Sequence, residues 1–136
     1  MREDIIKQAL SERYGDGSDP GPIAEATTTL LRLLHAELAL VVGAQASAAL
    51  VVHAVHRTRS KLDWTAPPAA APETLLVALH DDLAARPTAD CLFAGETLIF
   101  ALVDHLISLI GEPLTLRMLI SAWSTHGADQ SSQENL

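Results

Sequence analysis

The sequence predicts an all-α fold, a compact bundle of five or six helices, and three observations support this prediction. Ala and Leu dominate a composition that is 49% hydrophobic, and runs of β-branched and aromatic residues are absent. Apolar residues recur at the spacing of an α-helix along most of the chain. Gly and Pro fall between these periodic stretches, where they separate one helix from the next.

The first element is a short amphipathic helix within residues 1–14. Polar side chains separate the apolar positions that recur there at helical spacing, which are Ile5, Ile6, Ala9 and Leu10. Three Gly and two Pro then interrupt the chain between Gly15 and Pro22. Residues 15–21 should therefore form a flexible linker, and we expect the first helix to dock loosely on the bundle or onto another subunit.

The next two helices meet at Gly43. Pro22 suits the first turn of a helix, and Thr27 lies largely off the apolar face that follows. That face consists of Ile23, Ala26, Leu30, Leu33, Leu34, Leu38 and Val41. A further helix should extend from about Ala44 to Leu62. Gly43 either forms a turn or kinks one continuous helix, because a single Gly costs about 1 kcal/mol relative to Ala and is tolerated in helices.

Prolines and glycines also delimit the C-terminal helices. Pro72 opens a helix with a leucine face, and Pro87 ends it. The helix of about residues 88–111 is apolar on nearly all sides, so we place it at the centre of the bundle. Gly111 ends that helix as glycine commonly does, and a final helix continues to Trp123.

At 136 residues the chain has room for one core. Residues 22–125 are therefore interpreted as one helical bundle domain, preceded by the separate helix of residues 1–14. Residues 126–136 are polar and have no apolar periodicity, which predicts a disordered tail. No internal sequence repeat is apparent at any period.

The apolar helix of residues 88–111 indicates self-association. Each Leu or Ile that becomes fully buried contributes roughly 1.5–3 kcal/mol, and an uncovered face would forfeit that contribution. Symmetric pairing is the commonest way to cover such a face. We therefore expect a homodimer or a higher oligomer, with another protein as a further possible partner.

Five residues in the C-terminal third are candidates for interaction or architectural roles: Glu96, Phe100, Asp104, Arg117 and Trp123. Glu96 has apolar neighbours on the helical wheel, so it is either a functional acid or, the favoured interpretation, one half of an interhelical ion pair with an Arg. Arg117 could pair with Asp104 or Glu112 across the Gly111 turn and so fix how two helices meet.

Histidines are the remaining chemical candidates. His53 and His56 are three residues apart and share a helix face, where they could supply two metal ligands. Because no Cys pair or HExxH pattern supplies further ligands, we predict no metal site. The sequence also contains no Gly-rich phosphate loop and no nucleophile elbow, so we predict no catalytic residues and no cofactor. The cations Arg57, Arg59 and Lys61 would suit a phosphoaccepting histidine, although compensation of the helix dipole explains them more simply.

The overall charge and the single cysteine narrow the possible environments. A formal net charge of −8 argues against nucleic acid as a partner, because such binders usually present a basic face. Cys91 lies in an apolar stretch, which predicts a buried, inert thiol. Charged residues in Met1–Leu10 argue against a signal peptide, so we expect a cytoplasmic location. Leu38–Val55 approaches membrane-spanning length, but its polar residues argue against a membrane span.

Two segments resemble parts of small, uncharacterised bacterial all-helical proteins. They are VVGAQASAALVVHAVHRTR, residues 41–59, and LVDHLISLIGEPLTLRMLISAW, residues 102–123. In that group a Gly starts the central helix, and an Ile-Gly-Glu turn precedes an Arg-bearing last helix that ends near a Trp. The resemblance implies a bacterial origin and a compact helical fold, and it assigns no activity to any residue.

These observations predict a non-enzymatic helical module for protein–protein interaction or regulation that self-associates. Two alternatives stay open. One is a signalling domain with histidine phosphotransfer at His53 or His56, supported by Arg57. The other is a bundle that binds haem, a metal or a small ligand through histidines, for which the candidates are His35, His53, His56 and His105.

Overall fold

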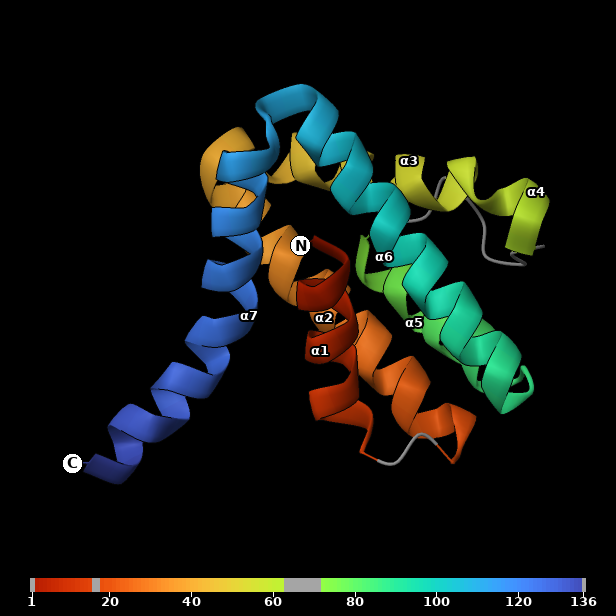
Figure 1. The fold of residues 1–136 in the computed structure, drawn as a ribbon. Coiled ribbons are helices and arrows are strands. Elements are labelled where there is room, and N and C mark those ends of the chain that lie inside the picture. The colour runs from red at the N-terminus through yellow and green to blue at the C-terminus, as the bar shows by residue number, and fades with distance from the viewer. Residues whose placement is uncertain (1, 16–17, 63–71, 136) are drawn as a thin grey trace.

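The predicted all-α fold is confirmed in the computed structural model (Figure 1). The model describes residues 2–15, 18–62 and 72–135, with only the backbone course described for residues 2, 60, 72 and 124–135. Its helices are α1 (Arg2–Tyr14), α2 (Pro20–Val42), α3 (Ala44–Arg57), α4 (Arg59–Leu62), α5 (Pro72–Ala84), α6 (Thr88–Ile110) and α7 (Glu112–Asn135). Six of these are main helices, and α4 is a single short turn.

The helix at the centre of the bundle is α2, which packs against α1, α3, α5, α6 and α7. The sequence interpretation had placed the helix of residues 88–111 there. That helix, α6, lies beside α2 and leaves Phe93 and Leu109 exposed. Burial of α2 extends to Thr27 and Thr28, whose hydroxyl groups donate to backbone carbonyls four residues earlier, at 2.9 and 3.0 Å. Thr27 was predicted to lie off the buried face, and this internal hydrogen bond is what permits its burial.

Two sharp glycine turns join the long helices to their successors. Gly43 lies between α2 and α3 with φ 93° and ψ 157°, and Gly111 lies between α6 and α7 with φ 90° and ψ 156°. This backbone region is essentially confined to Gly, so Gly43 forms a turn, one of the two alternatives that the sequence left open. Each Gly N–H donates to the carbonyl four residues earlier, and each Gly carbonyl accepts from the N–H four residues later. One helix therefore ends and the next begins without a loop.

The glycine turns belong to a structural repeat. The helices α1, α2 and α3 have 13, 23 and 14 residues, and α5 and α6 have 13 and 23 residues. A shift of 68 residues takes Gly43 to Gly111 and carries α2 onto α6. We call α1–α3 the first half and α5–α7 the second half. The prediction that the chain has no internal repeat is wrong at the level of structure.

Burial follows the same shift of 68 residues. Residues that are buried at equivalent positions of both halves include Ile23/Cys91, Ala26/Ala94, Thr27/Gly95, Leu30/Leu98, Leu31/Ile99, Leu34/Leu102, Leu38/Leu106, Ser47/Thr115, Val51/Leu119, Ala54/Ala122 and Val55/Trp123. The contacts between helices correspond in the same way: α2 of the first half packs on α5 and α7 of the second, and α6 of the second half packs on α1 and α3 of the first. Many pairs differ in residue type while both members stay buried, which explains why the repeat is hidden in the sequence.

The two halves cross where equivalent residues meet. A Cβ added at Gly95 of α6 would lie 2.5 Å from Oγ1 of Thr27 in α2, so the two backbones approach closely there. When two helices exchange under a two-fold rotation, equivalent residues face each other where the axis passes between them. Thr27 and Gly95 are such equivalents, which places an approximate two-fold axis at this crossing. The Gly is required because a larger side chain would collide with Thr27.

The first helix is part of the common core. Ile6 and Leu10 are fully buried, and the Arg13 guanidinium donates to the carbonyl of Trp123 at 3.4 Å. This differs from the expectation of loose docking, because α1 packs on α2, α6 and α7 together. Within the predicted linker, residues 16–17 lie outside the described residues.

The last helix is longer than the sequence indicated. The predicted helix ended at Trp123, whereas α7 continues to Asn135. The interpretation of residues 126–136 as a disordered tail stays a prediction.

Among the described residues, one helix, α6, has the length and composition of a membrane span. The sequence interpretation had instead singled out Leu38–Val55 as the nearest approach to a span. A helix that packs in the core of a bundle meets the same criterion, and α6 packs against α1, α2, α3, α5 and α7.

Candidate functional site

A groove of about 290 Å³ lies between the end of α3, the short α4 and the middle of α6. Its lining combines two cations, one carboxylate, two hydroxyl groups and an aromatic ring. The lining residues are Arg57, Thr58, Lys61, Thr97, Phe100, Ala101 and Asp104. We call this site the α4 groove.

Helical spacing brings one wall of the α4 groove together. Thr97, Phe100, Ala101 and Asp104 are separated by three, one and three residues, so they share a single face of α6. Phe100 is half-buried, and Asp104 is exposed. Phe100 and Asp104 were predicted as interaction or architectural residues, and the structure places both of them in this wall.

The other wall forms where α3 is interrupted at Thr58. The sequence predicted one helix up to Leu62, but Thr58 is buried and its hydroxyl donates to the Ala54 carbonyl at 3.0 Å. The helix α3 ends at Arg57, and α4 begins at Arg59 directly after the buried Thr58. Arg86, which pairs with Asp82 at 2.9 Å, donates a hydrogen bond to the Leu62 carbonyl and ties the end of α4 to the α5–α6 connection.

Two histidines lie together beside the α4 groove. The ring centroids of His53 in α3 and His105 in α6 are 4.5 Å apart, and the ring planes are inclined by 38°. Burial lowers the pKa of His105, and the nearby charges of His53 and Arg57 lower it further. Each influence disfavours the imidazolium, so the His105 ring is neutral at neutral pH.

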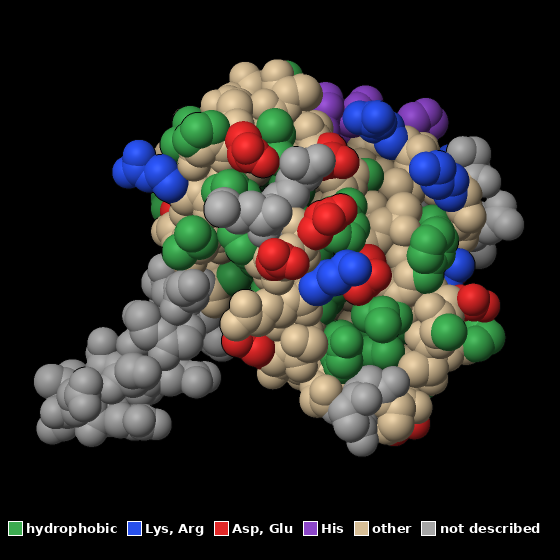
Figure 2. Space-filling view, in the orientation of Figure 1, with side chains coloured by type: hydrophobic (Ala, Val, Ile, Leu, Met, Phe, Trp, Pro, Cys, Tyr) green, Lys and Arg blue, Asp and Glu red, His purple; other side chains and the backbone are tan. Residues whose placement is uncertain are grey.

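Positive charge gathers at this edge of an otherwise acidic protein. Figure 2 shows His, Lys and Arg side chains together at the upper right, where Figure 1 places α3 and α4, while Asp and Glu side chains spread over the centre of the same face. Residues 44–62 contain Arg57, Arg59 and Lys61 and no carboxylate. We call these three cations, which are all exposed, the basic edge.

The first and second halves differ at this contact. The positions equivalent to His53 and His105 are Ser121 in α7 and Glu37 in α2, and there the Ser121 hydroxyl donates to the Glu37 carboxylate at 3.0 Å. The contact between α3 and α6 thus contains a histidine pair, whereas the equivalent contact between α7 and α2 contains a hydrogen bond from a hydroxyl group to a carboxylate. In the same way, Phe100 of the α4 groove replaces Arg32.

The other sequence candidates lie elsewhere. Glu96 is half-buried on α6, Arg117 is exposed on α7 and His56 is exposed on α3, and none of the three lines the α4 groove. Trp123 is buried, and its indole N–H donates to the Leu30 carbonyl at 3.1 Å, which fastens α7 to the middle of α2. His35 lies in another contact, 2.6 Å from the Ser47 hydroxyl.

The sequence did not predict that Lys61 and Thr97 line the same groove, or that His53 lies against His105. The spacing along α6 was visible in the sequence. Nothing in the sequence states which helix faces it, because that depends on the packing of distant segments. Of the four histidines proposed for haem or metal, the structure brings His53 and His105 together. The described residues contain no group of three or more His, Cys, Asp or Glu side chains placed to hold a metal ion.

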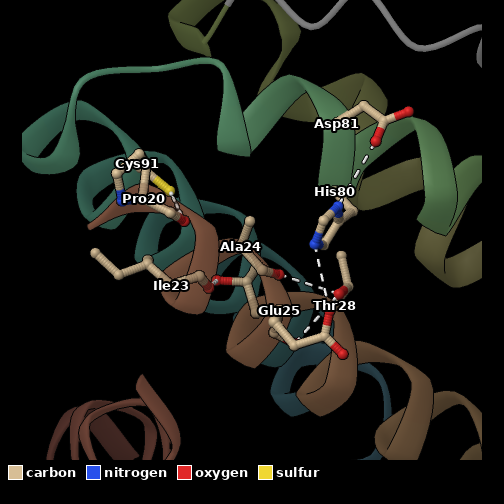
Figure 3. A network of polar contacts seen from close by, with 9 residues as sticks. Pro20, Ile23, Ala24, Glu25, Thr28, His80, Asp81 and Cys91 are labelled. Atoms are coloured by element: carbon tan, nitrogen blue, oxygen red, sulfur yellow. Dashed lines mark hydrogen bonds and ion pairs between the residues drawn. The ribbon is translucent and has the colours of Figure 1, made fainter. Parts of the chain in front are cut away.

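A second polar region joins α5 and α6 to the start of α2 (Figure 3). His80 of α5 lies 3.3 Å from the Glu25 carboxylate and 3.6 Å from that of Asp81. The Cys91 thiol donates to the Pro20 carbonyl at 3.5 Å, and burial raises its pKa to about 11 although Arg86 acts in the opposite direction. Cys91 is fully buried and its thiol stays protonated, as the sequence predicted, so this region is architectural.

Comparison with family models, with curated proteins and with solved structures finds no match for this chain. Of the resemblance stated above, the structure supports the coarse part, a small all-helical protein.

Proposed function

We propose that the chain is a non-enzymatic, cytoplasmic interaction module that self-associates through the surface around its two glycine turns. Large apolar side chains are exposed there, and this single observation carries the proposal. Leu40 and Val41 before Gly43 are 84% and 61% exposed, and Leu109 before Gly111 is 58% exposed. Together with the exposed Val42 and Leu114, these residues define the turn surface.

The turn surface departs from the usual pattern of exposed apolar residues. Single exposed leucines are common, whereas a consecutive run such as Leu40–Val42 is typical of an interaction site. Each of these side chains would contribute roughly 1.5–3 kcal/mol if a partner buried it. The exposure also occurs at equivalent positions, because Val41 corresponds to Leu109 in the repeat.

A second copy of the chain is the partner that best suits this surface. Figure 1 places the α2–α3 and α6–α7 turns at the same end of the bundle, and the repeat relates them by an approximate two-fold axis. A two-fold dimer uses one patch on both subunits, so a patch that already has two similar parts can match itself in register. The basic edge shares no residue with the turn surface.

The test is the mass of the protein in solution. Sedimentation equilibrium of the full chain at micromolar to millimolar concentration should show a dimer or a higher oligomer. The double variant Leu40→Ser with Leu109→Ser should shift it to monomer. The matched control is Val77→Ser, which removes an equally exposed apolar residue on α5 and should leave association unchanged. A wild-type chain that stays monomeric throughout would overturn the proposal.

Histidine phosphotransfer is a second candidate, and one observation favours it. His56 is exposed next to Arg57 and close to Arg59, two cations that could stabilise a phosphoryl group. Incubation with acetyl phosphate, followed by mass spectrometry under alkaline conditions, should then show a phosphohistidine that His56→Gln removes. Lack of a label on His56 would exclude this candidate.

A further inference from the structure

We infer that the α4 groove is a binding site for a small organic anion with an apolar body, a class that includes aryl carboxylates and aryl phosphates. This inference goes beyond the proposed self-association, because the α4 groove contains none of the residues of the turn surface. A bound anion would bridge the end of α3, the short α4 and the face of α6.

The size of the α4 groove limits the ligand to a small molecule. Its volume of about 290 Å³ lies just below the range of about 300–1,000 Å³ that is typical of small-molecule sites. A single ring with one charged head group fits that space.

The cations of the α4 groove select a negatively charged head group. Arg57 and Lys61 are four residues apart and both line the groove. A guanidinium can bind two oxygens of a carboxylate or phosphate at once, and an ammonium adds a point charge beside it. No carboxylate occurs in residues 44–62, so the charged side chains that this segment adds to the groove are both cations.

The helix direction orients the head group. Because His53 lies against His105, the later residue Lys61 approaches the earlier part of α6, where Thr97 lies. The Asp104 carboxylate lies next to His105 at the other end of the groove and repels an anion there. The head group therefore binds towards Lys61 and Thr97, where the Thr97 hydroxyl is a further hydrogen-bond donor.

The apolar body of the ligand packs on Phe100 and Ala101. Phe100 is half-buried, lines the α4 groove and also packs against the hydrophobic core. Aromatic rings in contact contribute about 0.5–1.5 kcal/mol beyond the area that they bury, which favours a ligand with a ring.

The repeat shows that packing does not demand these residues. Arg32 and Ala36 of α2 occupy the positions equivalent to Phe100 and Asp104, and the same helix architecture forms around them. A half-exposed Phe that lines the groove together with two cations therefore has a role that the scaffold alone does not explain.

Titration of the ¹⁵N-labelled full chain, followed by amide chemical shifts, tests the inference. Phenylacetate and phenyl phosphate are the two probes, and acetate and inorganic phosphate supply the head groups alone. We expect saturable shifts confined to residues 57–61 and 97–104, with a dissociation constant of about 1 mM or lower for at least one ring-bearing probe. The stronger of the two identifies the head group. No saturable shift from either probe at about ten times that concentration overturns the inference.

Variants separate a built site from general attraction to the basic edge. Arg57→Gln with Lys61→Gln should weaken binding of the ring-bearing probe at least tenfold. Arg59→Gln is the matched control, because Arg59 is an exposed cation between them that does not line the groove. Phe100→Leu should weaken the ring-bearing probe and leave inorganic phosphate unaffected. If Arg59→Gln weakens binding as much as the double variant, the attraction is non-specific and the inference fails.

Discussion

The halves α1–α3 and α5–α7 have the same succession of helices and the same glycine turn. They differ at two equivalent contacts, α7 with α2 and α3 with α6. Where α7 of the second half meets α2, the contact is a hydrogen bond between Ser121 and Glu37. Where α3 of the first half meets α6, the contact is the tilted ring pair of His53 and His105, with the α4 groove beside it.

This difference separates what the fold requires from what it permits. Leu34 and Leu102 are both fully buried, and Gly43 and Gly111 have nearly the same dihedral angles. These positions hold each half together in the same way. Half-exposed positions at the helix contact tolerate different chemistry, because solvent can satisfy their polar groups. At a contact that differs between the two halves, such as that of α3 with α6, residues for a function can be introduced without loss of stability.

Equivalent core residues provide the largest test of the comparison. Leu34→Ala and Leu102→Ala should each lower the free energy of unfolding by about 2–5 kcal/mol, because each leaves a cavity at a fully buried position. Chemical denaturation measures both values. Leu40→Ala, at an exposed position of α2, should change stability by less than about 0.5 kcal/mol. If one core variant is costly and the other nearly neutral, the halves do not contribute equivalently.

The glycine turns should respond alike and somewhat less strongly. Gly43→Ala and Gly111→Ala each force a side chain into a backbone region that costs about 1–3 kcal/mol. Space is available at Gly43, where a Cβ would meet nothing within 4 Å, so the loss there reports backbone strain alone. Thermal unfolding of both variants checks this, and an unchanged melting temperature for either one would contradict it.

The crossing of the two long helices should be sensitive to one methyl group. Gly95→Ala places a Cβ 2.5 Å from Oγ1 of Thr27, an overpacking that costs about 1–3 kcal/mol, offset by roughly 1 kcal/mol of helix propensity. Thr27→Ala in the same chain should recover most of the loss, which a double-mutant cycle measures. Gly21→Ala is the control, because a Cβ there would meet nothing within 4 Å. Equal effects at Gly21 and Gly95 would exclude a close crossing.

The histidine pair should produce a small dependence of stability on pH. Because the pKa of His105 is lower in the folded protein than in the unfolded chain, the unfolded chain binds more protons between the two values. The stabilisation is complete above the unfolded pKa of about 6.5, and it is lost as the pH falls towards the folded pKa. Denaturation curves between pH 7.5 and 5 should show this loss, and His56→Gln, at an exposed position outside the pair, should retain it.

Transplanting the contact of the other half sharpens the same test. The double variant His53→Ser with His105→Glu recreates the Ser121–Glu37 arrangement at the equivalent positions. It should fold and lose the pH dependence that His105 causes. A variant that unfolds would show that the two contacts are not interchangeable, and the approximate symmetry would then end at the core.

The candidate site was only partly predictable from the sequence. The spacing of Phe100 and Asp104 placed both on α6, and Arg57 was recognised as a cation next to His53 and His56. The α4 groove also depends on the interruption at Thr58, between α3 and α4, which the sequence did not indicate. Thr27 and Thr28 make the same hydroxyl-to-carbonyl bond within α2, which continues past them, so a Thr in a helical stretch does not by itself predict a break.

The sequence by itself determined the helices, because helical periodicity and the stops at Pro and Gly are local properties that need no knowledge of the partners. It predicted a turn or a kink at Gly43, a helix end at Gly111 and a buried thiol at Cys91, and the structure has a turn at Gly43 together with the other two features. Only the tertiary structure decided that α2 is central, that Thr27 is buried against Gly95 and that the chain is a repeat. Those features depend on which faces of distant helices pack together, and many different apolar residues satisfy the same packing.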